Sequence, residues 1–308
     1  MIFAARGVMV SLAFFAIVYS FLSLLLMLLW RGWRRIVPRN VETPNLLFWL
    51  RLLPFVFSAA ITVFLTFPSF LLLEAHSMDE DLGTFVLCLC SLLFLGGGLF
   101  RVIAAQGRTR RAEAEWLETA SRAEGGESGP ATFACPNPLP IMLAGIRTPR
   151  VLVSKAARAL LTEGELQAAV RHEMAHLRSS DNLKKAIFNF ISFPGMACLE
   201  RAWQEAAELD ADLKAVSTRG EALDLASALV KLSRGCPPLA PALATGLVGV
   251  AESVAMRVER LLEWERSPKA IQHWRYVVPL TLAAMVSLAA NLGPALVVTH
   301  FLTERLVP

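Results

Sequence analysis

Apolar residues are concentrated in four long runs, and charged residues fill the segments between them. The runs cover residues 8–30, 52–73, 82–100 and about 276–302. The first run has no charged residue, and an apolar helix of this length crosses the ~30 Å hydrocarbon core of a bilayer. The pattern therefore predicts an integral membrane protein with about four transmembrane helices.

These runs divide the chain into three predicted parts. Residues 1–105 form a membrane domain with the first three transmembrane helices, and residues 273–308 hold the fourth helix and a short tail. Residues 106–272 form a polar domain that carries the candidate chemistry. The composition agrees, because a hydrophobic share of 55% is above the usual value for soluble proteins.

The distribution of arginine predicts the orientation in the membrane. Arginine is frequent after the first and third runs, whereas the acidic loop 74–81 has no Lys or Arg. The residues concerned are Arg31, Arg34, Arg35 and Arg39 after the first run and Arg101, Arg108, Arg110 and Arg111 after the third. Because positive loops stay in the cytoplasm, the N-terminus is expected outside and the polar domain inside.

The polar domain has mainly helical periodicity with one pair of short strands. Two β-like runs at 139–144 and 150–154 flank a turn-forming segment and predict a hairpin. Helices are expected at 221–234 and 251–266. The apolar segment 186–199 is too short to span, and we favour its packing beneath the helices of the motif described next over a position on the membrane surface. The predicted fold class is mainly α, with a small β-hairpin or sheet.

Residues 172–176 form an H-E-x-x-H motif. Residues four apart lie on one face of a helix, so the imidazoles of His172 and His176 can close on one metal ion. Glu173 can then reach a metal-bound water without being a ligand itself. The alternative interpretation is a pair of surface histidines on an amphipathic helix.

The flanking residues predict that the motif lies in the middle of a helix. Thr162 and Glu165 form a capping box that starts a helix, and the polar cluster 179–182 indicates its end. A helix in this position is the context that the motif needs for metal binding.

A candidate third ligand follows in a second predicted helix. Glu208 and Asp212 are four residues apart and share a face, which favours Glu208 as ligand and Asp212 as acceptor for a ligand imidazole N–H. Glu205, one turn earlier, is the alternative ligand, and periodicity alone does not separate it from Glu208. A solvated acidic helix face would also give this pattern.

Several segments together resemble the gluzincin membrane metallopeptidases. They are residues 150–154, 164–166 and 172–182 and the block Glu208-x-x-Ala211-Asp212. The resemblance is closest to the M56 family of BlaR1/MecR1-like enzymes, and the M48 peptidases of the HtpX/Ste24 type share the E-x-x-A-D block. The short gap between His176 and Glu208 is similar to M56 proteins, whereas two membrane spans separate these blocks in the HtpX type. The resemblance covers residues 130–265 well and the spans only loosely.

The resemblance implies a Zn²⁺ ion held by His172, His176 and Glu208, with Glu173 as general base. Asp212 is expected to fix the tautomer of a ligand imidazole from outside the coordination sphere. A zinc ion with three protein ligands keeps one position for water, which is the arrangement of catalytic sites. The resemblance therefore implies a zinc metalloendopeptidase.

The implied function is hydrolysis of peptide bonds on the cytoplasmic side of the bacterial inner membrane. Family members that sense β-lactams carry a penicillin-binding domain after the last span, which this chain is expected to lack. The resemblance then implies a signalling protease that cleaves a repressor of the winged-helix BlaI type in response to another signal. The alternatives are HtpX-like quality control of membrane proteins and a non-catalytic membrane scaffold with a structural zinc site.

The remaining composition excludes other classes of site and partner. The five Cys include no C-x-x-C pair, so neither a disulfide framework nor a cysteine zinc site is indicated. The net charge of +4 comes mostly from the basic loops, and no nucleic-acid-binding motif is present. The expected partners are a protein or peptide substrate and the lipid bilayer, without nucleic acid. The oligomeric state stays open.

Overall fold

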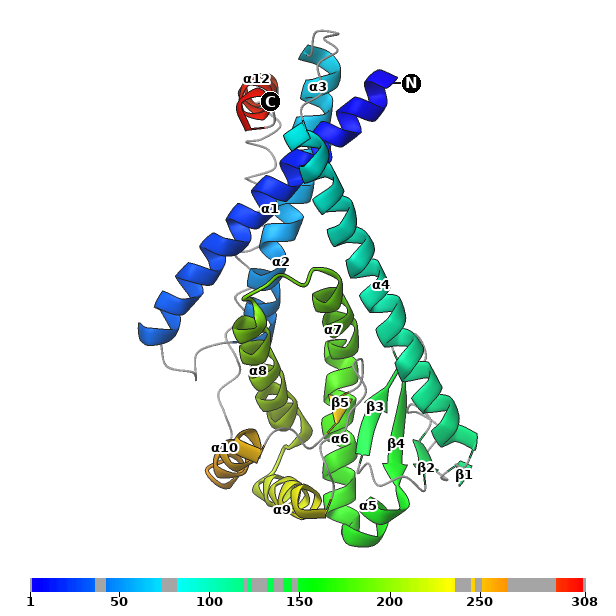
Figure 1. The fold of residues 1–308 in the computed structure, drawn as a ribbon. Helices are drawn as coiled ribbons and strands as arrows, with labels where there is room; N and C mark the ends of the chain where they lie inside the picture. The colour runs from blue at the N-terminus through cyan, green and yellow to red at the C-terminus, as the bar shows by residue number, and fades with distance from the viewer. Residues whose placement is uncertain are drawn as a thin grey trace.

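The computed structural model describes residues 2–36, 43–73, 82–118, 121–122, 132–135, 141–145, 149–235, 245–246, 251–264 and 292–306. In this part of the chain helices predominate, and a small sheet lies at one end of the molecule (Figure 1). The predicted fold class, mainly α with a small sheet, is confirmed at this level.

The helices fall into an apolar group and a polar group. The apolar group contains α1 (Ile2–Ile36), α2 (Pro44–Ile61), the π-helical segment η2 (Thr62–Thr66), α3 (Phe67–Leu73), α4 (Leu82–Glu118) and α12 (Leu292–Leu306). The polar group contains α5 (Lys155–Leu160), α6 (Glu163–Ser179), α7 (Asp181–Phe190), α8 (Ala197–Ala215), α9 (Arg219–Gly235) and α10 (Ala251–Leu262).

Among the described residues, three helical segments are long and apolar enough to cross a membrane. They are Ala5–Arg34, Pro44–Leu73 and Leu82–Ala114, and they contain the first three predicted runs. The second begins earlier than its apolar run, because the Thr43 side chain caps the helix and Pro44 occupies its first turn. The fourth predicted helix lies mostly outside the described residues, which include only α12 from this region.

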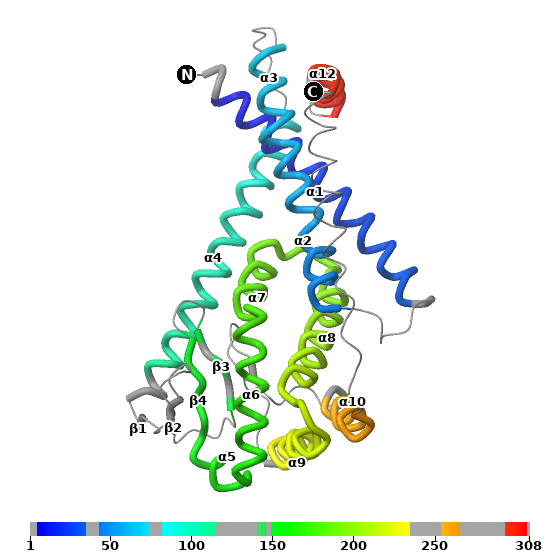
Figure 2. Tube along the Cα trace, turned by 180° about the vertical axis from the view of Figure 1, so that it is seen from behind, coloured from blue at the N-terminus to red at the C-terminus, as the bar shows by residue number. Residues whose placement is uncertain are grey.

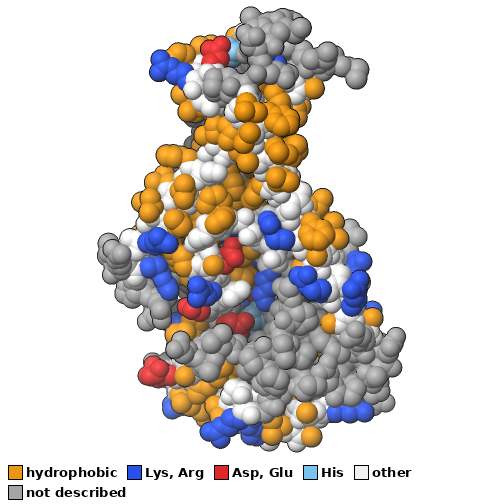
Figure 3. All heavy atoms as spheres, in the orientation of Figure 1, with side chains coloured by type: hydrophobic (Ala, Val, Ile, Leu, Met, Phe, Trp, Pro, Cys, Tyr) orange, Lys and Arg blue, Asp and Glu red, His pale blue; other side chains and the backbone are white. Residues whose placement is uncertain are grey.

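The surface of these helices is apolar. Large hydrophobic side chains cover much of the upper and middle part of the face seen in Figure 3. Phe21, Leu28, Phe64, Leu93 and Phe100 are among the exposed ones. A soluble monomer rarely exposes so much contiguous apolar surface, whereas a bilayer would cover it.

The sheet contains the predicted hairpin and further short strands. Its strands are β1 (Ser121–Arg122), β2 (Thr132–Cys135), β3 (Ile141–Ala144), β4 (Arg150–Ser154) and β5 (Thr245–Gly246), in the order β1-β2-β4-β3-β5. β3 and β4 are antiparallel, as predicted, with Leu143 opposite Val151, whereas β2 runs parallel to β4. Ile141, Val151 and Val153 pack with Ala168 and Ala169 of α6, so the sheet and α6 share one core.

The apolar segment 186–199 joins the two groups of helices. It forms the end of α7, a turn and the start of α8, and this connection lies among α1, α2 and α4 in both views (Figures 1 and 2). Phe188 and Trp203 pack there with Trp30 and Phe48. The segment is therefore packed, as we favoured, but against the apolar helices rather than only beneath the motif helix.

A buried polar network fixes this connection. The carbonyl of Ile191, just after α7, accepts hydrogen bonds from Tyr19 Oη of α1 and Arg51 Nη2 of α2, both at 2.7 Å. Arg51 is fully buried, and its Nε also lies 3.1 Å from Glu200 Oε1 at the start of α8. A buried charge is costly unless it is paired and hydrogen-bonded, so these contacts favour a single arrangement of the connection.

Two glycines of α4, Gly96 and Gly98, allow a test of how closely the connection between α7 and α8 approaches α4. A Cβ at Gly98 would overlap the carbonyl oxygen of Phe190, whereas a Cβ at Gly96 would have nothing within 4 Å. We expect Gly98→Ala to destabilise the protein by about 1–3 kcal/mol, because backbone must move. Gly96→Ala on the same helix should be neutral or stabilising by up to about 1 kcal/mol. Thermal unfolding in detergent measures both, and equal midpoints would contradict this packing.

Candidate metal centre

The helix of the motif, α6, begins at the predicted capping box. Thr162 Oγ1 accepts from the Glu165 N–H at 3.4 Å, and Glu165 Oε2 accepts from the Thr162 N–H at 2.8 Å. Glu165 also contacts Ser227 at 2.6 Å and Lys231 at 2.8 Å on α9. The capping residue therefore also holds α6 against α9.

The charge of Glu165 is stabilised by these partners. Burial alone would raise the pKa of its carboxyl, but the hydrogen bonds from Lys231, Ser227 and the Thr162 N–H outweigh burial and lower the pKa to about 2. The carboxylate is thus ionised over the whole physiological range.

The end of α6 is set by a left-handed residue. Ser180 has a φ of 55°, the only positive φ of a non-glycine residue in the described part of the chain. Its N–H bonds to the Leu177 carbonyl at 3.0 Å, and α7 begins at the next residue, Asp181. This sharp break turns Asp181 back towards the last turn of α6.

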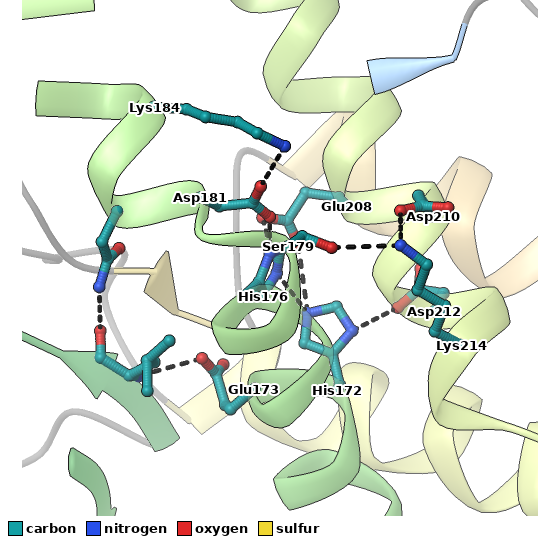
Figure 4. Close-up of polar contacts among 12 residues, drawn as sticks. His172, Glu173, His176, Ser179, Asp181, Lys184, Glu208, Asp210, Asp212 and Lys214 are labelled. Carbon is teal, nitrogen blue, oxygen red and sulfur yellow. Dashed lines mark hydrogen bonds and ion pairs between the residues drawn. The ribbon is translucent and has the colours of Figure 1, made fainter. Parts of the chain in front are cut away.

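The structure brings His172, His176 and Glu208 together. His172 Nε2 lies 3.1 Å from His176 Nε2, and the oxygens of Glu208 lie 3.4 Å from His172 Nε2 and 3.6 Å from His176 Nε2. The ligand atoms of the three residues are all within 4.8 Å of one another, and the three side chains converge from α6 and α8 (Figure 4). This group could hold a metal ion. Glu205 is not part of it, so the geometry selects Glu208 from the two alternatives.

Each imidazole has a carboxylate next to its Nδ1, on the side away from Glu208. His172 Nδ1 lies 2.9 Å from Asp212 Oδ1, and His176 Nδ1 lies 2.7 Å from Asp181 Oδ2. An acceptor at Nδ1 keeps the proton there and turns Nε2 towards a metal. Asp212 therefore has the expected position, whereas the role of Asp181 was not predicted, because the sequence marked residues 179–182 only as the end of a helix.

The surroundings of His176 favour a positive charge. Burial alone would lower the pKa of its imidazole, but the charge of Glu208 and the contact with Asp181 outweigh burial and raise the pKa to about 10. The same negative groups would attract a metal cation to Nε2 in place of the proton.

Glu173 is buried beside this group and faces the sheet. Its Oε2 accepts a hydrogen bond from the Leu143 N–H of β3 at 3.0 Å. Burial raises the pKa of the Glu173 carboxyl, and the nearby His172 and His176 oppose this rise in part. A raised pKa suits a carboxylate that exchanges protons near neutral pH.

Asn182 and Arg257 complete the site. Asn182 Nδ2 donates to the Gly145 carbonyl at 3.1 Å and so ties the end of β3 to α7. Arg257 of α10 is buried and contacts Glu208 and Asp212 of α8. Sequence reasoning missed both residues, because their roles depend on elements that meet only in the folded chain.

The donor set fits a zinc ion. Two imidazole nitrogens and a carboxylate are ligands that zinc takes in catalytic sites. The carboxylates behind both imidazoles are the outer partners usual for metal-binding histidines.

Comparisons with known proteins add no relative. No protein-family model matches the chain, and no curated protein matches it significantly. The assignment of function therefore depends on the site itself.

Removing the charge at Glu165 should make stability depend less on pH. Glu165→Gln is expected to lower the free energy of unfolding by about 1–2 kcal/mol at pH 7, because a charge-assisted bond is lost. A group with a lowered pKa contributes stability above its unfolded value, so the wild-type advantage should vanish as pH falls from 4.5 towards 2. Unfolding in detergent at several pH values measures this. Glu163→Gln, at an exposed residue of the same turn, should change little at any pH.

Asp181 should contribute to metal affinity without touching the metal. Asp181→Asn is expected to weaken zinc binding about 10- to 100-fold, because the carboxylate behind His176 loses its charge. Competition with a chromogenic chelator measures the affinity. Asp210→Asn, at a partly exposed residue of α8, is the matched control and should bind zinc normally. Equal affinities of the two variants would mean that Asp181 has only a structural role.

Proposed function

We propose that the chain is a zinc-dependent endopeptidase embedded in a membrane. The observation that carries the proposal is the convergence of His172, His176 and Glu208 with Glu173 beside them. Metal-ligand groups of this kind are also found in structural sites, but those usually use four protein ligands and often cysteine. Three ligands with an adjacent buried carboxylate favour a catalytic site.

The proposed mechanism assigns the proton transfers to Glu173. A bound zinc ion would lower the pKa of its water and polarise the scissile carbonyl. Glu173 would accept a proton on its carboxylate from the water that attacks the scissile carbonyl, and would deliver it to the amine that leaves when the C–N bond breaks. The Leu143 N–H holds Oε2 of Glu173, so that the carboxylate is oriented before substrate arrives.

The position of the site supports a cytoplasmic peptidase. The proposed location is the bacterial inner membrane, with the N-terminus outside and the site in the cytoplasm, and the arginine-rich segments after the first and third apolar runs support this orientation. The strand beside the motif helix, β3, pairs with β4 on one side and with β5 on the other, so an extended substrate backbone could add to the described sheet only at an outer strand.

The proposed substrate class follows from the resemblance to M56 peptidases. We expect a cytoplasmic BlaI-like repressor to be cleaved, which makes the enzyme part of a signalling pathway. Quality control of membrane proteins is the alternative within the peptidases, and a silent scaffold with structural zinc is the alternative outside them.

Variants of the motif separate chemistry from metal binding. Glu173→Ala should keep its zinc but lose peptide cleavage by about 100- to 10,000-fold, whereas His172→Ala should lose both. Zinc is measured by elemental analysis of purified protein, and cleavage by comparing protein N-termini in cells that express each variant. Glu205→Ala is the control and should behave as wild type.

The new N-termini also identify the substrate. A repressor among them supports signalling, and misfolded membrane proteins support quality control. A folded Glu173→Ala protein that still cleaves would rule out the proposed role of Glu173.

A further inference from the structure

The guanidinium of Arg257 contacts Glu208 and Asp212, the acidic pair that α8 contributes to the metal centre. Nε and Nη2 each lie 2.7 Å from an oxygen of Asp212, and Nη1 lies 3.0 Å from Glu208 Oε2. Arg257 is 1% exposed and comes from α10, an element that carries neither the motif nor the acidic pair. One side chain therefore fixes two carboxylates from outside the helix that carries them.

The spacing on α8 makes this double contact possible. Glu208 and Asp212 are one helical turn apart and face the same way, so a planar guanidinium can span them. A lysine ammonium lacks this planar fork and could not bind Asp212 through two parallel N–H donors while it also contacts Glu208. Asp212 Oδ1 also contacts His172, so Arg257 supports a ligand imidazole as well as a ligand carboxylate.

The contact with Glu208 makes its two oxygens unequal. Both oxygens lie near an imidazole, Oε2 at 3.4 Å from His172 Nε2 and Oε1 at 3.6 Å from His176 Nε2, and Oε2 is also engaged by the charge of Arg257. A carboxylate can bind a metal ion through one oxygen or through both. Binding through both would fill the position that a catalytic zinc reserves for water.

We propose that Arg257 is a positioning residue that limits Glu208 to one-oxygen binding and so keeps a metal position open for water. This inference rests on the metal site of the proposed function, but not on peptidase activity. An arginine with a purely structural role would be a costly choice here, because a buried ion pair is often no more stabilising than apolar residues of similar volume.

The coordination of cobalt tests the proposal without a substrate. The full chain is purified in detergent, stripped of metal and loaded with one equivalent of Co²⁺, whose visible bands are intense when four-coordinate and weak at higher coordination. We expect Arg257→Gln to bind cobalt but to lose visible absorption by roughly threefold, because both oxygens of Glu208 can then bind. Arg260→Gln, at an exposed residue of the same helix, should keep the wild-type spectrum.

A rescue experiment separates positioning from folding. Arg257→Ala is expected to show the same weak bands, and added guanidinium should restore them in this variant while leaving wild type unchanged. A wild-type spectrum in Arg257→Gln would overturn the proposal. Loss of cobalt or of the fold in Arg257→Gln, together with failure of guanidinium to restore the bands in Arg257→Ala, would also overturn it.

The outcome for wild type distinguishes this proposal from the proposed function. The inference is supported if wild type holds four-coordinate cobalt and Arg257→Gln shows weak bands, even if no peptide is cleaved. In that case only the peptidase assignment fails. If wild type does not bind cobalt, both fail.

Discussion

The two buried imidazoles of α6 impose the constraint on which the polar half of the molecule depends. A buried polar group needs partners, and an imidazole has two nitrogens to satisfy. His172 and His176 turn both Nε2 atoms towards Glu208 and receive Asp212 and Asp181 at Nδ1. These partners come from α7 and α8, so the requirement of one helix determines where two others must lie.

The buried carboxylates that contact the imidazoles also need partners of their own. Asp212 is itself buried, and the charge of Arg257 holds the pKa of its carboxyl below the usual value despite burial. Glu173 faces the opposite way and binds the backbone of β3. A sheet strand and four helices are thus connected through one set of polar contacts, in which the removal of any member leaves another buried group without compensation.

The sequence predicted the local features of this centre better than the long-range ones. The capping box, the motif face of α6 and the shared face of Glu208 and Asp212 all depend on helical periodicity within a few residues. The periodicity could not select Glu208 over Glu205, because only the packing of α8 on α6 decides which turn faces the imidazoles.

The residues that were missed depend on contacts between distant segments. Asp181 reaches His176 only because Ser180 breaks the helix in a left-handed conformation. Arg257 follows Asp212 by many residues and meets it through α10, which no spacing rule relates to α8. The path of segment 186–199 likewise depends on Tyr19, within the first apolar run, and on Arg51, just before the second, and the sequence pattern does not relate either residue to this segment.

The helix α7 acts as a spacer of fixed length. One end is bonded to the apolar helices through the Ile191 carbonyl, and the other begins at Asp181, which holds His176. Ten helical residues rise about 15 Å, so the candidate metal centre stands about that far from the buried contacts among α1 and α2. Under the proposed function, a polypeptide substrate that entered from the bilayer would span this height with roughly five residues if it were extended like a strand.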